Sequence, residues 1–292
     1  MPRKINESGS CLLLCVVLAG ASCVGATARE YTFDGEMSRE VLESYLARAV
    51  TFAGLLHGRG DVDANLRFLT NTGAKLAGRA VYRWGGEASL DDVLSTAAPV
   101  AAKVHAADPE IILQAAAFEI VTEQVNQLPI PERVFRVFDL EPETRNFRYA
   151  DMIYPEGHRG IDRWWQGASV PDMSRLETRM WFVYLAGRYI DLGCEAIHFG
   201  QVEIMDDRDP EHVHWRDMLA RVRRYAREHA RRHFVLCDAH VPSGGIVHDG
   251  NTMFDFHSFP LRIEEVADKP QQGVLQVGYL DSIYGRSAGG VT

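Results

Sequence analysis

The chain has 292 residues, of which 46% are hydrophobic and 24% are charged, which is the balance of an ordinary globular protein with enough material for a large core. Its formal net charge is −9. Because nucleic-acid binding depends on positive charge that meets phosphates, this acidic composition disfavours that class of function.

The first residues have the features of a secretory signal peptide. Two basic residues precede the apolar run Cys11–Gly20, and the sequence Ala-Thr-Ala that ends at Ala28 offers a cleavage site. The run is shorter than the roughly 20 apolar residues that a membrane-spanning helix needs, and no later segment supplies one. We therefore predict a signal peptide over residues 1–28, no membrane span, and a secreted or periplasmic mature protein. A lipid anchor on Cys23 is the alternative.

Residues 29–48 form an N-terminal segment with one expected helix, Met37–Ala49. After it, short runs with strand character alternate with helical patterns, which favours parallel strands joined by crossover helices. Eight runs have strand character: Ala49–Leu56, Lys75–Trp84, Ile111–Glu119, Phe147–Tyr154, Ala196–Ile204, Phe234–His240, Met253–Phe259 and Val274–Asp281.

Helix signals lie between these runs. One helix is expected to begin at Asp61 or Asp63 and to end at Gly73, and another to begin at Pro171 or Asp172 and to end at Gly193. The basic run Arg221–His233 follows apolar residues at helical spacing, so we interpret it as the solvated face of a helix. The link after the seventh run has room for at most a short helix.

Eight such units predict a (β/α)8 barrel, the TIM barrel, over residues 49–292, with an open doubly wound parallel sheet as the alternative. The sequence after the eighth run has no eighth helix. Either the barrel closes without that helix, with Met37–Ala49 as a substitute, or the chain is a fragment of a longer protein. Outside the leader only Cys194 and Cys237 remain, and both lie in apolar runs where buried free thiols are expected, a single disulfide being the alternative.

Polar residues collect where the expected strands end. In a barrel the loops at the carboxyl ends of the strands converge on one mouth, and residues two apart on a strand share a face. Eight polar residues have this placement: Glu119, Gln201, Glu203, Asp238, His240, Asp255, His257 and Asp281. Since burying so many ionisable groups without a function would be costly, we predict a shared pocket.

Other residues favour a sugar as the ligand of that pocket. Arg79 lies within an apolar strand. It is interpreted either as the counter-ion of one of these acids or as a residue that holds the substrate. Trp84, Trp164 and Trp165 lie at or beyond strand ends. Aromatic faces beside carboxylates and arginine suit a sugar ring, which has apolar CH faces and a hydroxyl rim.

With these features the sequence resembles the exported (β/α)8-barrel glycoside hydrolases, over roughly Ala49 to Asp281. The resemblance rests on architecture and on carboxylate placement. The largest clan of such enzymes has an Asn-Glu pair after strand four and a Glu after strand seven, where this chain has YADMIYPEG and FDFHSF. The roles of the clan residues are therefore not carried over.

The leading hypothesis is a glycoside hydrolase that uses two carboxyl groups and no cofactor or metal. Glu203 and Asp238 are the best pair, because neighbouring strands lie about 4.8 Å apart and the mechanism needs carboxyl groups about 5 to 9 Å apart. Glu119, two strands from Glu203, is the alternative partner. The predicted substrate-binding residues are Arg79, Trp84, Trp164, Trp165, Gln201, His240, Asp255 and His257.

Two other functions stay open. A metal-dependent barrel hydrolase could use His198, His240 and His257 as ligands. The first run, however, carries only His57 beyond its end and no His-x-His pair, and His198 alone is more typical of a core histidine. A non-catalytic exported barrel that binds a glycan without cutting it is the third hypothesis.

Overall fold

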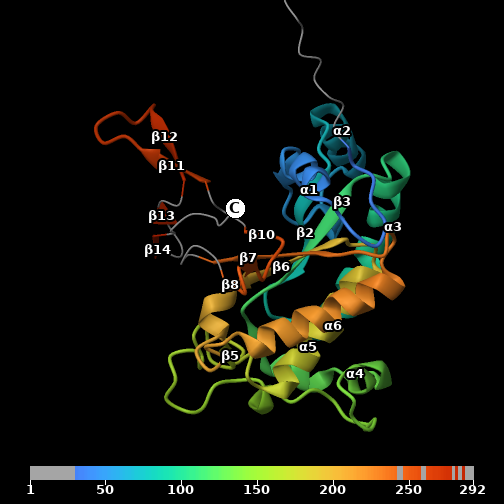
Figure 1. Ribbon diagram of the computed structural model, residues 1–292, viewed down its shortest axis with the longest axis vertical. Helices are drawn as coiled ribbons and strands as arrows, with labels where there is room; N and C mark the ends of the chain where they lie inside the picture. The colour runs from blue at the N-terminus through green and yellow to red at the C-terminus, as the bar shows by residue number, and fades with distance from the viewer. Residues whose placement is uncertain (1–29, 242–245, 258–260, 278–279, 282–284, 287–292) are drawn as a thin grey trace, which may run out of the picture.

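The computed structural model describes residues 30–241, 246–257, 261–277, 280–281 and 285–286 (Figure 1). Within them the fold is mixed α/β, with six α-helices around a six-stranded parallel sheet. The strands follow one another in chain order: β1 (Ala49–Thr51), β2 (Leu76–Arg83), β3 (Ile112–Ala117), β6 (Ala196–Gln201), β7 (Leu236–His240) and β10 (Phe256–His257).

The sheet curls into a half-barrel. A cavity of about 310 Å³ is lined both by Val50 on one edge strand, β1, and by Phe256 on the other, β10. A doubly wound sheet would reverse its strand order at a switch point, and the order here does not reverse. The doubly wound alternative is therefore wrong for this sheet.

The helices are α1 (Arg39–Leu46), α2 (Val62–Thr72), α3 (Leu90–Ala107), α4 (Glu132–Val137), α5 (Leu176–Asp191) and α6 (Val213–His229). The predicted ends of α2 are confirmed, since the Asp61 carboxylate accepts from the Ala64 backbone N–H and Gly73 closes the helix with φ 61°. Helix α5 begins at Leu176, later than predicted. The apolar face of α6 is confirmed, because Trp215 and Met218 are among its fully buried residues.

Two predicted strands are wrong. The run Phe147–Tyr154 pairs with no parallel strand and contains the 3-10 helix η4 (Tyr149–Asp151). Its aromatic residues made the run look like a strand, but they enter the core from an irregular segment. The last run is not part of the main sheet either, because β12 (Gly273–Val277) pairs antiparallel with β11 (Leu261–Glu265), in the link where at most a short helix was expected.

A local turn explains this hairpin, since the chain from Val266 to Gln272 lets β11 fold back on β12 at little cost in loop closure. Figure 1 shows the hairpin away from the six-stranded sheet. The short pairs are β4 (Val121–Thr122) with β5 (Ala168–Ser169), β8 (Val247–His248) with β9 (Asn251–Thr252), and β13 (Leu280–Asp281) with β14 (Gly285–Arg286). The other 3-10 helices are η1 (Leu55–His57), η2 (Glu87–Ser89), η3 (Glu123–Gln127) and η5 (Val202–Met205).

Helix α1 covers the N-terminal ends of the parallel strands. Its buried Val41 and Tyr45 belong to a small apolar cluster with the first residues of four strands: Leu76, Ile112, Ala196 and Leu236. Ser38 caps this helix, which confirms the predicted element. The helix closes the bottom of the half-barrel and does not take the place of an eighth outer helix.

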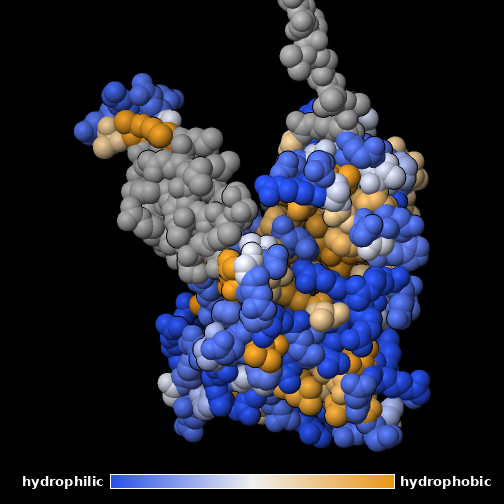
Figure 2. Space-filling view, viewed as in Figure 1, coloured by the Kyte–Doolittle hydropathy of each residue, from blue (hydrophilic) through white to orange (hydrophobic). Residues whose placement is uncertain are grey.

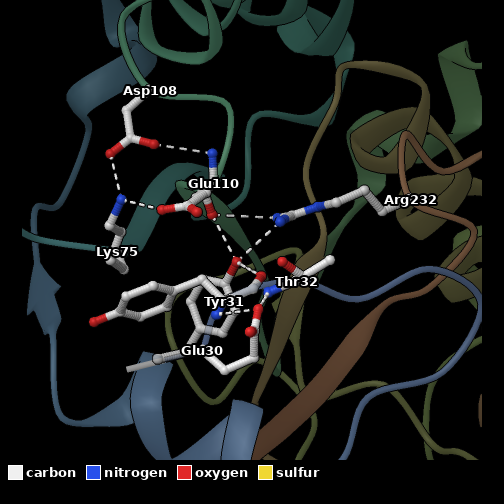
Figure 3. A network of polar contacts seen from close by, with 8 residues as sticks. Glu30, Tyr31, Thr32, Lys75, Asp108, Glu110 and Arg232 are labelled. Atoms are coloured by element: carbon white, nitrogen blue, oxygen red, sulfur yellow. Dashed lines mark hydrogen bonds and ion pairs between the residues drawn. The ribbon is translucent and has the colours of Figure 1, made fainter. Parts of the chain in front are cut away.

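Ion pairs reinforce this end of the sheet. Figure 3 shows Lys75 between Asp108 and Glu110, with Nζ 2.7 Å from the Asp108 carboxylate, and Arg232 directed at the Glu110 backbone carbonyl. The fully buried Glu195 accepts from Arg231 at 2.7 Å and from Arg232 at 2.6 Å. The charges at the bottom of the sheet are thus paired with one another.

Both thiols outside the leader are free and buried, as predicted, and burial raises the pKa of Cys237 to about 12. Among the residues that the model describes, no helix is long and apolar enough to span a membrane. On the face seen in Figure 2, apolar residues lie in separate patches on a mainly hydrophilic surface. The predicted signal peptide and Cys23 lie outside the described residues.

Candidate active site at the C-terminal end of the sheet

Two β-bulges shape the upper half of the sheet. The register between β2 and β3 shifts between Ala77 and Val81, and Arg79 within this bulge has a φ of 54°. The register between β6 and β7 shifts between His198 and Gln201. Bulges redirect side chains and are frequent beside active sites, and a bulky residue at positive φ is strained, so both deviations point to this region as a functional one.

A buried polar network fills the interior of the half-barrel at this level. Asp238, with no exposed surface, accepts from Gln114 Nε2 at 2.6 Å and bonds His198 Nδ1 at 2.8 Å. The Gln114 side-chain oxygen accepts from the Arg79 backbone N–H at 3.0 Å. Strands β2, β3, β6 and β7 therefore each contribute one member.

The network also positions the Arg79 guanidinium. A guanidinium can only donate, so the Arg79 contact assigns His198 Nε2 as the acceptor and Nδ1 as the donor to Asp238. Arg79 Nη2 lies 3.4 Å from His198 Nε2. The arginine is thereby held on the inner face of the half-barrel, where it lines the 310 Å³ cavity together with Gln114 and His257.

Glu119 is fully buried beneath the bend at the end of β6. Its carboxylate accepts from the Gln201 backbone N–H at 2.9 Å and from Gln201 Nε2 at 2.8 Å. Gly200 has a φ of 62°, and a Cβ at this position would overlap the Glu119 carboxylate. The structure thus brings Glu119 and Gln201 together as predicted, but both Glu119 oxygens are used to hold the β6 bend.

Glu203 and Asp238 come from neighbouring strands, because Asp238 is in β7 and Glu203 directly follows β6. Glu203 is half-buried in η5, directly after β6, and His257 ends β10. Burial lowers the pKa of His257, while the nearby charges of Asp238 and Glu203 oppose that shift. Both members of the predicted pair are thus near enough to His257 for their charges to act on it. His240, also buried, is opposite Gln201 in the pairing of β7 with β6.

Aromatic rings form a row beside this network, with Phe118 at its centre. The Phe118 ring centroid lies 5.6 Å from that of Tyr82, 5.2 Å from that of Trp84 and 6.1 Å from that of His198. Trp84 in turn lies 5.0 Å from Trp164. These separations are typical of favourable edge-to-face contacts, so the row is a continuous apolar platform that ends at the polar network.

The loop that carries Trp164 and Trp165 is held over the ends of β2 and β3. The pairing of β4 with β5 fixes its base, and Trp164 Nε1 donates to the Glu119 backbone oxygen at 3.2 Å. Trp165 is 48% exposed and lies against Gly85. The three predicted tryptophans are thus near one another, at the upper edge of the sheet.

Asp255 is engaged by protein groups outside the network, and its role in substrate binding stays a prediction. Its carboxylate accepts from Arg223 of α6 at 3.2 Å and from the Cys237 backbone N–H at 2.7 Å. Asp255 is level with Cys237 and faces the helix layer, because β10 begins only at Phe256. Asp281 is in β13, which pairs with β14, so it does not end a strand of the parallel sheet.

Two members of the site were not predicted: Gln114 and Phe118. Gln114 is an isolated polar residue in the otherwise apolar run IILQAAAF, and this interruption was the available signal. Phe118 looked like an ordinary core residue. Its importance depends on which strands are neighbours, because it contacts residues of β2 and β6 from the end of β3.

Within the described ranges, no three His, Cys, Asp or Glu side chains are grouped so that they could hold a metal ion. Searches of protein-family models and of curated proteins found no match to this chain.

Proposed function

We propose that the protein is a carbohydrate-active enzyme of the glycoside hydrolase type, with its active site at the C-terminal ends of β2, β3, β6, β7 and β10. The observation that carries this proposal is the aromatic row at Phe118, which ends at the buried network of His198 and Asp238, with Glu203 directly after β6. Two carboxyl groups near an aromatic platform are the parts that hydrolysis of a glycosidic bond requires.

In this proposal Glu203 is the general acid or base. It is half-buried, whereas Asp238 and Glu119 have no exposed surface, so Glu203 is the group of the three best able to meet a bound substrate. Asp238 is the second carboxyl group of the proposed pair, and it also holds the His198 ring. Glu119 is a positioning residue, because it holds the bend that presents Gln201 and Glu203.

The remaining polar residues bind the substrate. The Arg79 guanidinium and His257 line the interior cavity, and both can donate hydrogen bonds to sugar hydroxyls. Trp84, Trp164 and Trp165 supply apolar faces for the CH side of the ring. We assign Gln201 and His240, which oppose each other across β6 and β7, to the rim of the same pocket.

We further propose that the half-barrel is of the (β/α)8 type. The parallel strands follow chain order, helix α1 closes their N-terminal ends, and the candidate site is at the opposite end. Active sites of (β/α)8 enzymes occupy that C-terminal end, which supports this assignment. The signal sequence over residues 1–28 supports export to a compartment where polysaccharides are met.

A non-catalytic glycan-binding protein is the second candidate. Its specific support is that Asp238 and Glu119 are completely buried and that their oxygens are engaged by protein groups. Such carboxylates can organise a binding site without chemistry.

Turnover separates the two candidates. The purified protein would be incubated with a panel of plant, algal and bacterial polysaccharides, and new reducing ends would be measured. The enzyme proposal expects release from at least one glycan, and a loss of at least about a hundredfold in Glu203→Gln and in Asp238→Asn. Binding without release in the wild type would support the second candidate and contradict the first.

The catalytic partner can be checked on the same substrate. Glu119→Gln retains one acceptor for Gln201, so a smaller loss than in Asp238→Asn is expected if Asp238 is the partner. A larger loss in Glu119→Gln, with an unchanged unfolding transition, would make Glu119 the partner instead.

A further inference from the structure

A hollow of about 370 Å³ lies beside the candidate active site. Its lining includes His57, Arg59, Tyr82, Arg83, Trp84 and Asp92. This volume lies within the range of small-ligand pockets, which begins at about 300 Å³. None of these side chains except Trp84 belongs to the substrate site proposed above.

The wall nearest the site is aromatic. Tyr82 and Trp84 are two residues apart at the end of β2, so they face the same way, and Trp84 keeps 38% of its surface exposed. The His57 ring centroid lies 5.0 Å from that of Tyr82, and the His57 Nε2 atom accepts from the Tyr82 backbone N–H at 3.4 Å. The aromatic wall is thus fixed by packing and by a backbone contact.

The rest of the lining carries a positive charge. Its lining has two arginines, Arg59 and Arg83, and one carboxylate, Asp92. Arg59 has no ion pair with any described residue. Burial lowers the pKa of His57, and the charges of Arg59 and Arg83 lower it further. Arginines thus outnumber carboxylates in the lining of the hollow.

A row of aromatic rings connects the wall of the hollow with the candidate active site. Tyr82 and Trp84 both contact Phe118, which also lies against His198 and beneath the Arg79 guanidinium, 5.7 Å from the ring centroid. A chain of sugar units that lies along this aromatic row would cover both places.

From this geometry we infer a second sugar-binding site: the hollow between Trp84 and Arg59 binds the neighbouring unit of an oligosaccharide, and that unit carries a carboxylate. The inference rests on the proposed function for the position of the first unit. It assigns the substrate class as acidic oligosaccharides of at least two uronate units. Tyr82 and Trp84 stack on the sugar ring, and the arginines bind its carboxylate.

The probes are oligomers of galacturonate, glucuronate and mannuronate of one to four units, with galactose, glucose and mannose oligomers of equal length. Binding to Glu203→Gln, which keeps the hollow intact, is measured by titration calorimetry. At least one uronate series is expected to bind more tightly than its neutral counterpart, with a gain of about tenfold between one unit and two. Removal of the charge in Arg59→Gln should weaken that binding about three- to tenfold.

Arg67→Gln is the matched control, because Arg67 is an exposed arginine of α2 outside the hollow and should bind like the parent. Trp84→Ala should weaken binding about tenfold, whereas Trp84→Phe, which keeps an aromatic face, should restore most of it. The circular dichroism spectrum of each variant checks the fold.

Absence of uronate binding at millimolar concentration would overturn the inference, as would equal affinity for uronate and neutral oligomers with no effect of Arg59→Gln. Failure of the proposed function has a different result. Uronate binding that depends on Arg59 and Trp84, without turnover by the wild type, would retain the second site and refute the enzyme. Turnover of a neutral glycan that is insensitive to Arg59→Gln would support the enzyme and refute the second site.

Discussion

The two ends of the parallel sheet differ in how their charged groups are satisfied. At the N-terminal end, Lys75, Glu110 and Glu195 are engaged by neighbouring opposite charges, and α1 covers the strand ends. At the C-terminal end, two bulges interrupt the strands, Arg79 has a positive φ, and Glu203 is half-buried beside a histidine. The same sheet thus has one end built for stability and another where strain and ionisable groups are concentrated, as expected of a functional site.

The largest stability effect is expected at the N-terminal end. Glu195→Gln removes a fully buried carboxylate and leaves Arg231 and Arg232, whose side chains are 29% and 15% exposed, without their counter-charge. Loss of one partner of a buried pair costs about 3 to 5 kcal/mol, and the partial exposure of the arginines reduces this to about 2 to 3 kcal/mol. Urea unfolding measures the change. Any turnover per folded molecule should stay within twofold, and a variant as stable as the wild type would contradict the structural role of Glu195.

A smaller effect is expected at the bend of β6. Gly200→Ala places a methyl group at φ 62°, which costs about 1 to 2 kcal/mol, and also pushes on the Glu119 carboxylate. Gly35→Ala is the control, since Gly35 has a φ of 75° near the N-terminal end but no atom within 4 Å of an added Cβ. Thermal unfolding should show a greater loss for Gly200→Ala than for Gly35→Ala. Equal losses would mean that the Glu119 contact contributes nothing.

A further difference between the two ends concerns how the free energy of unfolding changes with pH. Burial raises the pKa of Asp206, directly after η5, from 3.8 to about 7, although His212 opposes this shift. Between these two values the folded protein holds a proton that the unfolded chain has released. The free energy of unfolding therefore decreases as the pH rises from about 4 to 7 and then levels off. Asp206→Asn should remove much of this decrease, and an unchanged pH profile would contradict the shift.

His105, near the N-terminal end of the sheet, changes the free energy of unfolding with pH in the opposite direction. Burial lowers the pKa of His105 from 6.5 to about 4, with Arg231 as the next cause. Its contribution to stability is full above pH 6.5 and is lost as the pH falls towards 4. His105→Phe should therefore flatten the acid side of the stability profile. If Asp206→Asn and His105→Phe changed the pH dependence of stability in the same direction, the contrast between the two ends would be contradicted.

Much of the sheet could be predicted from the sequence, because six of its strands coincide with apolar runs bounded by turn or cap residues. Phe147–Tyr154 could not be distinguished from a strand, since burial of aromatic residues does not require a pairing partner. The antiparallel pairing of β11 with β12 competed with a place in the parallel sheet, and local pairing has the lower entropic cost.

The site was predicted less completely. Glu203, Asp238 and His257 followed from the rule that function collects at the carboxyl ends of strands. Asp255 was expected to share a face with His257. Because β10 is only two residues long, Asp255 precedes it, and the alternation of side chains along a strand does not apply to this residue. The strained Arg79 and the contacts of Phe118 depend on bulges and on strand neighbours, which the pattern of apolar residues does not encode.

The most direct test of a catalytic C-terminal end compares Glu203→Gln with Glu211→Gln, an exposed glutamate of the same connection between β6 and α6. On the glycan that the wild type cleaves best, kcat is measured together with the free energy of unfolding. Glu203→Gln should lose at least about a hundredfold in kcat and change stability by about 1 kcal/mol or less, while Glu211→Gln should match the wild type in both. A near-normal kcat in Glu203→Gln would contradict the assignment of this end of the sheet as the active site.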